Sequence, residues 1–124
     1  MITGIGTDII RIERMVTAWE RHGERLSERI LVPSERAQFA AHADPMRFLA
    51  KRWAAKEATA KALGTGIRAG VGFQTIEITN DALGKPEVAL HDGAADRLHE
   101  LGASRCWLTL SDEAEYAVAF VVIQ

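Results

Sequence analysis

The chain has 124 residues, of which 48% are hydrophobic and 26% charged, a composition typical of one globular domain with a single core. We therefore expect one domain over residues 1–124. The formal net charge of −2 argues against nucleic-acid binding, and no apolar run approaches the roughly 18 residues of a membrane span. The N-terminus lacks the pattern of a secretion signal and Cys106 has no second cysteine to pair with, so we expect a cytoplasmic protein.

The N-terminal third predicts one strand followed by helices. A strand is expected over 3–9, where glycines would let a ligand or another backbone approach closely. From Ile12 the apolar residues follow helical spacing, and this helix is expected to stop at Gly23. Further on, Ser34 is expected to cap a short helix that carries Phe39.

The strongest helix signal runs from Asp44 to Gly64. Asp44 suits the N-cap, Pro45 suits the first turn, and Gly64 suits the left-handed position after the last turn. On a helical wheel, Glu57 falls inside the apolar arc around Trp53. A carboxylate on a buried face needs a charged partner or a cation.

The second half is rich in strands. Strands are predicted over 71–79, 86–91, 105–111 and 116–124, with a helix over 92–102. Because the two long helices precede most of the strands, we expect an α+β fold, with an antiparallel sheet packed on a long helix, rather than a doubly wound parallel sheet.

Two explanations fit the position of Glu57. Lys61 follows one turn later, and the pair could be a plain structural salt bridge. Alternatively, Glu57 and Asp8, which ends a glycine-flanked strand, could hold Mg²⁺, an ion that takes one or two protein carboxylates and completes its shell with water and phosphate oxygens. Asp8 alone could equally be a turn or cap residue.

The segment from Arg47 to Arg68 carries six basic residues against one acid, Glu57, and predicts a cationic patch suited to a small polyanion. Within it, "GTGIRAG" at 64–70 leaves a helix instead of entering one. It is therefore neither a Rossmann fingerprint nor a Walker loop. It is either a flexible turn after the helix or a place where backbone amides meet a phosphate.

Four stretches together carry a resemblance: "GIGTDIIRIERM", "RFLAKRWAAKEATAKALGTGI", "DALGKPEV" and "LTLSDEAEYAVAFVV". In this order, over nearly the whole chain, they resemble the bacterial holo-acyl-carrier-protein synthases, the short class of 4'-phosphopantetheinyl transferases. The resemblance implies transfer of the phosphopantetheine arm of coenzyme A to a serine of apo-acyl carrier protein in fatty-acid biosynthesis, with release of adenosine 3',5'-bisphosphate.

The resemblance also implies roles for particular residues. Asp8 and Glu57 would hold Mg²⁺, and Lys61 would lie near the transferred phosphate as the third catalytic residue. The serine proton would pass either to Glu57 or to a metal-bound water. The residues implied in coenzyme A binding are Arg47, Arg52, Lys61, Gly64, Thr65, Gly66, Lys85 and Pro86.

Two interfaces follow from the same resemblance. Acyl carrier proteins are acidic, and the relatives meet them with basic residues, here Arg14, Arg21 and Arg25; without the resemblance, an ordinary solvated helix face would be the preferred explanation. Family members of this length form homotrimers with active sites between protomers, and we expect the same here.

One position departs from part of the family, because Asp112 stands where several relatives have histidine. A role assigned to that histidine does not transfer to this chain. Two other functions fit the same residues: a magnesium-dependent phosphohydrolase acting on a nucleotide or coenzyme A, and a module that binds coenzyme A without changing it.

Overall fold

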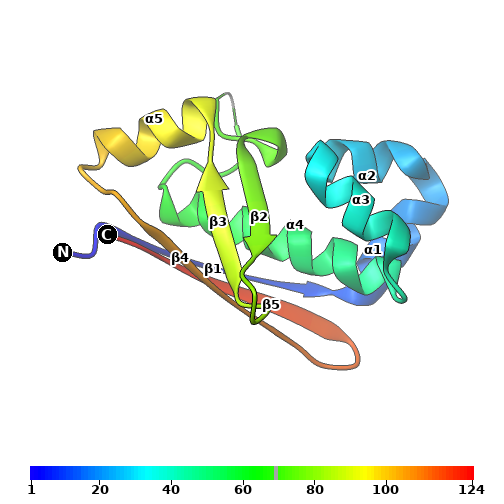
Figure 1. Cartoon of the computed structure of the whole chain (residues 1–124). Coiled ribbons are helices and arrows are strands. Elements are labelled where there is room, and N and C mark those ends of the chain that lie inside the picture. Colours follow the sequence, from blue (N-terminus) through cyan, green and yellow to red (C-terminus); the bar gives the residue numbers. More distant parts are fainter. Residues whose placement is uncertain (69) are drawn as a thin grey trace.

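The computed structural model of the chain describes residues 1–68 and 70–124. Its helices are α1 (Ile12–His22), α2 (Glu24–Ile30), α3 (Pro33–Ala41), α4 (Pro45–Ala62), the short 3-10 helix η1 (Phe73–Thr75) and α5 (Asp92–Glu100). Its strands are β1 (Gly4–Arg11), β2 (Ile76–Asn80), β3 (Pro86–Leu90), β4 (Cys106–Asp112) and β5 (Tyr116–Ile123). This mixture of helices and antiparallel strands confirms the expected α+β fold (Figure 1).

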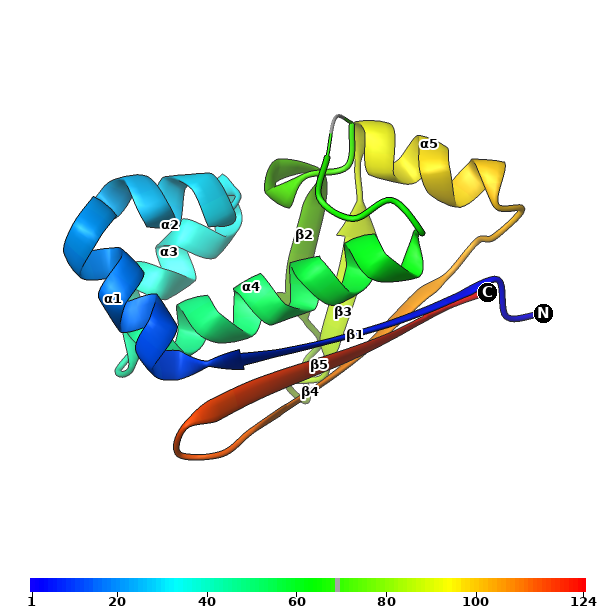
Figure 2. The ribbon, with the colours of Figure 1, turned by 180° about the vertical axis from the view of Figure 1, so that it is seen from behind.

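The longest helix, α4, packs on a three-stranded antiparallel sheet with the order β1-β5-β4. The register pairs Gly4 with Ile123 and Arg11 with Tyr116, so the two chain ends lie side by side (Figure 1). Alternate residues of β5, beginning with Ala117, are buried under α4. Helices α1 to α3 gather around the first half of α4, while the separate β2–β3 hairpin and α5 lie toward its other end (Figure 2).

Two glycines of β1 let this strand touch the backbone of α4. A Cβ atom at Gly4 would overlap the carbonyl oxygen of Ala62, and one at Gly6 would overlap that of Ala58. The expectation that these glycines serve a close approach is confirmed, and the approaching group is a helix backbone. As a result, Asp8, two residues further along the same face of β1, lies beside the last turns of α4.

Local signals located most helix ends correctly. Gly23 follows α1 with φ of 60°, and its N–H donates to the carbonyl of Trp19. Asp44 caps α4 by accepting a hydrogen bond from the N–H of Arg47. Gly64 adopts the expected left-handed conformation, with φ of 78°.

Three details differ from the sequence-based expectation. Ser34 does not cap α3; Glu35 accepts from the N–H of Val32 instead, and the Ser34 hydroxyl donates to Glu77 on β2. Helix α2 was not predicted. The strand expected from Val71 begins only at Ile76, because η1 occupies the residues before it.

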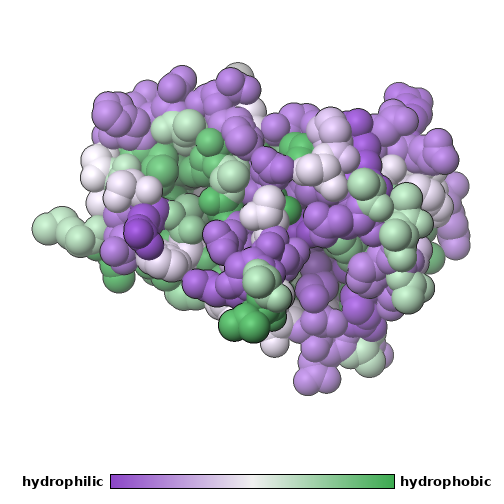
Figure 3. Space-filling model, in the orientation of Figure 1, coloured by the Kyte–Doolittle hydropathy of each residue, from purple (hydrophilic) through white to green (hydrophobic). Residues whose placement is uncertain are grey.

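The outer face of the three-stranded sheet is apolar and uncovered. Its exposed large side chains are Ile5 and Ile9 on β1, Phe120 on β5 and Trp107 on β4. On the side of the molecule seen in Figure 3, polar residues dominate over α1 to α3, whereas apolar residues gather where α5 and β4 lie. Among the helices that the structure describes, none combines the length and apolar character needed to cross a membrane.

We predict that Gly6→Ala destabilises the fold by about 3 kcal/mol, because the added methyl group must push β1 away from α4. Urea denaturation gives the free energy of unfolding. Gly72→Ala is the matched control: its site has open space and an ordinary φ of −143°, so its effect should stay within about 0.5 kcal/mol. Equal losses in the two variants would contradict the role assigned to the strand-helix contact.

Candidate active site

The close contact of β1 with α4 brings Asp8 and Lys61 together. The Lys61 ammonium donates to Oδ1 of Asp8 and to the carbonyl oxygen of Thr7, both at 3.0 Å. The side chain of Asp8 is only 14% exposed, and its Oδ2 atom is buried without a hydrogen-bond partner among the residues that the structure describes. Buried carboxylate oxygens are nearly always paired, so this atom indicates a missing ligand.

Glu57 lies one turn before Lys61 on α4 and is half-buried. Burial raises the pKa of Glu57, the nearby negative charge of Asp8 raises it further, and Lys61 acts in the opposite direction. The alternative of a Glu57–Lys61 salt bridge is not realised, since Lys61 pairs with Asp8 and no ion pair in the described part of the chain includes Glu57. Lys61 therefore neutralises Asp8 directly and acts on Glu57 only from a distance.

This arrangement fits a divalent cation whose remaining ligands are water and phosphate oxygens. A cation would relieve the repulsion between Asp8 and Glu57 and would satisfy the unpaired oxygen of Asp8. Among the described residues, no cluster of three or more His, Cys, Asp or Glu side chains is placed to hold a metal. Two carboxylates alone suit Mg²⁺ completed by water and phosphate oxygens better than a closed zinc site.

The glycine segment after α4 lies next to Lys61, but the amides of its first three residues are already used. The N–H of Gly64 donates to the carbonyl of Lys61, while the N–H groups of Thr65 and Gly66 both donate to that of Ala60. The idea that these amides meet a phosphate is therefore not supported by this conformation. Residue 69 of the same segment lies outside the described residues.

Arg47, expected among the coenzyme A ligands, holds the turn between β4 and β5 against α4. Its guanidinium contacts Asp112 at 3.0 Å, Asp44 at 3.1 Å, and the carbonyl oxygens of Glu113 and Ala114 at 2.6 and 3.2 Å. These contacts occupy the guanidinium. In this conformation, Arg47 acts as a structural clamp, and it also lines a hollow of about 240 Å³ with Lys51 and Arg52.

Arg52, the other expected phosphate ligand on α4, is buried. It is 5% exposed, lies over the Phe48 ring and donates to the side chain of Gln38. The cationic patch predicted from Arg47 to Arg68 is therefore not a continuous surface. Lys61, whose side chain is 51% exposed, is the predicted phosphate contact of α4 that remains accessible.

Lys85 and Pro86 lie at the opposite edge of the sheet from Asp8. With Trp107 and Cys106 they line a cavity of about 410 Å³ between β3 and β4, where the ammonium of Lys85 lies 5.2 Å from the centre of the Trp107 ring. Strand β5 separates this edge from β1. One chain therefore does not bring the two groups of predicted coenzyme A residues together.

The cysteine of this cavity is not a nucleophile. Burial raises the pKa of Cys106 to about 12, so the thiol stays protonated at neutral pH.

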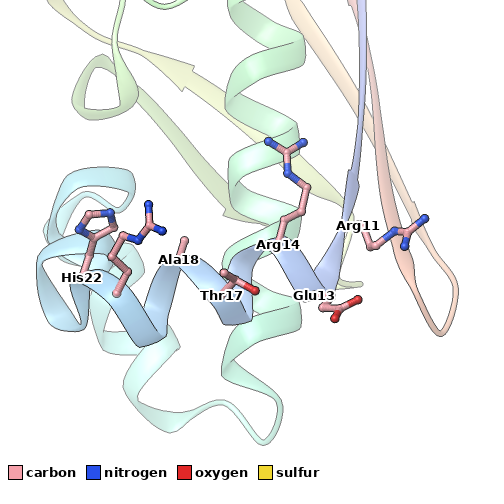
Figure 4. Close-up of a pocket in the computed structure, with 7 residues that line it drawn as sticks. Arg11, Glu13, Arg14, Thr17, Ala18 and His22 are labelled. Carbon is pink, nitrogen blue, oxygen red and sulfur yellow. The ribbon is translucent and has the colours of Figure 1, made fainter.

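The predicted partner surface on α1 forms a shallow depression of about 320 Å³. Arg14 and Arg21 line it, as expected, and Arg11 and His22 extend it at its two ends (Figure 4). Arg25, in the first turn of α2, is exposed but does not line the depression.

An ion pair that was not predicted lies at the centre of the fold. Lys56 and Glu35 are both fully buried, and their charged groups lie 2.7 Å apart. Burial lowers the pKa of Lys56, whereas Glu35 acts to raise it. No local pattern in the sequence indicates this pair, because the two residues belong to different helices. Lys56 stands in an alanine-rich helix, where a lysine side chain could also be exposed.

Comparison with known proteins gives a consistent result. The model of the 4'-phosphopantetheinyl transferase superfamily matches residues 4–121. The holo-[acyl-carrier-protein] synthase of Yersinia pestis (strain Pestoides F) is 54% identical over 123 residues, covering 99% of this chain and 98% of that protein.

Two solved structures share the fold over nearly the full length. The holo-[acyl-carrier-protein] synthase of Neisseria meningitidis has a TM-score of 0.95 and 47% identity, covering 100% of this chain and 99% of that one. The synthase of Bacillus anthracis, solved in complex with CoA (3',5'-ADP), has a TM-score of 0.84 and 37% identity, covering 99% and 96%. The family expected from the sequence motifs is thus confirmed, and the chain belongs to the 4'-phosphopantetheinyl transferase superfamily.

Proposed function

We propose that the protein is a holo-acyl-carrier-protein synthase, which transfers the 4'-phosphopantetheine arm of coenzyme A to a serine of apo-acyl carrier protein in fatty-acid biosynthesis. The observation that carries this proposal is the unpaired, buried oxygen of Asp8 next to Glu57 and Lys61. This group of residues matches the phosphate chemistry of the family to which the chain belongs. The relatives from Yersinia pestis and Neisseria meningitidis carry the same activity in their names.

Each residue of the site has a task in such a transfer. Asp8 and Glu57 would hold Mg²⁺, which when bound neutralises pyrophosphate charge. Lys61 can leave the carbonyl of Thr7 and direct its ammonium to the transferred phosphate, since half of its side chain is already in solvent. Glu57 can accept the serine proton, because its raised pKa makes it a stronger base than an ordinary glutamate.

Intact-protein mass spectrometry tests the reaction directly. Apo-acyl carrier protein incubated with coenzyme A, Mg²⁺ and the wild-type chain should gain one phosphopantetheine, and EDTA should abolish the gain. Glu57→Gln keeps the side-chain shape but removes the charge, so we expect at least a hundredfold slower transfer from a folded protein. Full activity of this variant would exclude the proposed role of Glu57.

The same experiment separates the competing functions. Loss of coenzyme A in the absence of any carrier protein would indicate a phosphohydrolase. Binding of intact coenzyme A, without modification of any of several carrier proteins, would indicate a binding module.

We propose that the α1 depression receives an acidic helix of the carrier protein. Arg11, Arg14 and Arg21 outnumber Glu13, the acid that lines the same depression (Figure 4). Arg25 lies in the first turn of the next helix. Arginine clusters of this kind recognise carboxylates and guide association between oppositely charged proteins.

Arg14→Ala should weaken carrier-protein binding about tenfold and reduce its salt dependence, with coenzyme A affinity unchanged. Calorimetric titrations with each substrate, at two salt concentrations, measure both effects. Arg29→Ala, which removes an exposed arginine of α2 outside the depression, is the matched control. A loss confined to coenzyme A affinity would show that Arg14 does not belong to the surface that binds the carrier protein.

We also propose that the active protein is a homotrimer whose active sites lie between protomers. Lys85 and Pro86 lie across the sheet from Asp8, so a neighbouring chain is needed to bring both groups to one coenzyme A molecule. The uncovered apolar face with Ile5, Ile9 and Phe120 offers a surface for that neighbour.

Phe120→Glu should convert the trimer to monomers, because it places a charge at the centre of the apolar face. Light scattering after size exclusion should show three times 13.6 kDa for the wild type and one chain mass for the variant. Thr79→Glu, on the exposed part of β2, controls for added charge. A monomeric wild type with full activity would overturn the shared site.

A further inference from the structure

Lys56 is an ammonium group held at the centre of the fold by three hydrogen bonds. It donates to Oε1 of Glu35 at 2.7 Å, to the carbonyl oxygen of Ile30 at 2.7 Å and to that of Phe73 at 2.8 Å. An ammonium has three N–H donors, and here all three are used. The side chain thereby ties α4 to the end of α2, to the start of α3 and to η1.

Glu35 completes this arrangement from the other side. Its Oε1 atom also accepts from the N–H of Val32, and its Oε2 atom accepts from the N–H of Ile78 on β2. Both charged groups are fully buried, and both are surrounded by matched partners. Replacing such a pair with well-packed neutral residues is often neutral or stabilising, so stability alone is a weak explanation for it.

The geometry of α4 indicates what the pair does. Lys56 and Ala58 lie about 200° apart on the helix, so they face opposite sides. Ala58 touches Gly6 of β1, and Lys56 holds the other side. Glu57 lies between them in sequence, on the turn that these two contacts fix.

We propose that Lys56 is a positioning residue of the active site: its three hydrogen bonds set the rotation of α4 and thereby the place of the Glu57 carboxylate relative to Asp8. Side-chain ends lie about 5 to 6 Å from a helix axis, so a rotation of about 10° moves them by about 1 Å. Functional groups tolerate displacements of only about 0.5 Å. This inference rests on the proposed function, because it assigns Lys56 a part in the site built by Asp8 and Glu57.

Two variants test the inference without changing the net charge buried around Glu35, where Arg52 also lies, 3.9 Å away. The double variant Lys56→Met with Glu35→Gln removes both charges together. Lys56→Arg keeps the charge, but a planar guanidinium cannot direct three donors to the same three acceptors. Ile123→Ala, in the core of β5 and away from the pair, is the control for lost stability.

The readout is Mn²⁺ binding in the presence of coenzyme A, followed by electron paramagnetic resonance, together with the Mg²⁺ dependence of transfer. We expect both Lys56 variants to bind Mn²⁺ at least tenfold more weakly than the wild type while remaining folded, and the control to bind normally. Wild-type affinity in either folded Lys56 variant, an equal loss in the control, or absence of Mn²⁺ binding by the wild type would overturn the inference. If the double variant fails to fold, the Mn²⁺ affinity of Lys56→Arg alone tests the inference.

The experiment also separates this inference from the proposed function. A wild type that binds Mn²⁺ but modifies no carrier protein would refute the transferase, while the comparison of variants would still decide whether Lys56 positions the metal site.

Discussion

The contact between the backbones of β1 and α4 is the constraint on which the candidate site depends. Glycine at positions 4 and 6 removes the side chains that would otherwise separate strand and helix. The strand then carries Asp8 to within 3.0 Å of Lys61, although 53 residues separate them in sequence. A wider strand-helix spacing would leave Asp8 and Glu57 as two unrelated carboxylates. The candidate site therefore depends on the absence of a side chain at these two positions of β1.

The sequence predicted what is encoded locally. A cap at Asp44, a stop at Gly23 and a left-handed turn at Gly64 depend on residues within one turn of themselves, and the structure has all three. The inward position of Glu57 was also indicated by helical spacing. The unpaired oxygen of Asp8 was not, because it depends on how closely β1 approaches α4.

The prediction of a cationic surface patch was wrong for charged side chains whose partners are distant in sequence, whereas the binding of coenzyme A by Arg47 and Arg52 stays a prediction. Lys56 and Arg52 on α4 were predicted to belong to a surface patch. Both are buried next to Glu35, which lies on α3. Arg47 is held by the β4–β5 turn, 65 residues away. Residue type gives the charge, but only the tertiary fold decides whether that charge meets solvent, a ligand or a buried counter-ion.

The environments of Asp112 and Glu57 differ in a way that bears on proton transfer. Asp112 contacts Arg47 and Lys51. Partial burial acts to raise the pKa of Asp112, but Lys51 and Arg47 hold this pKa below its ordinary value. A carboxylate that is paired and weakly basic is a poor proton acceptor. Glu57 has the opposite environment, since burial and the charge of Asp8 raise its pKa. Of these two carboxylates, Glu57 therefore has the environment of the better proton acceptor as long as no cation is bound to it.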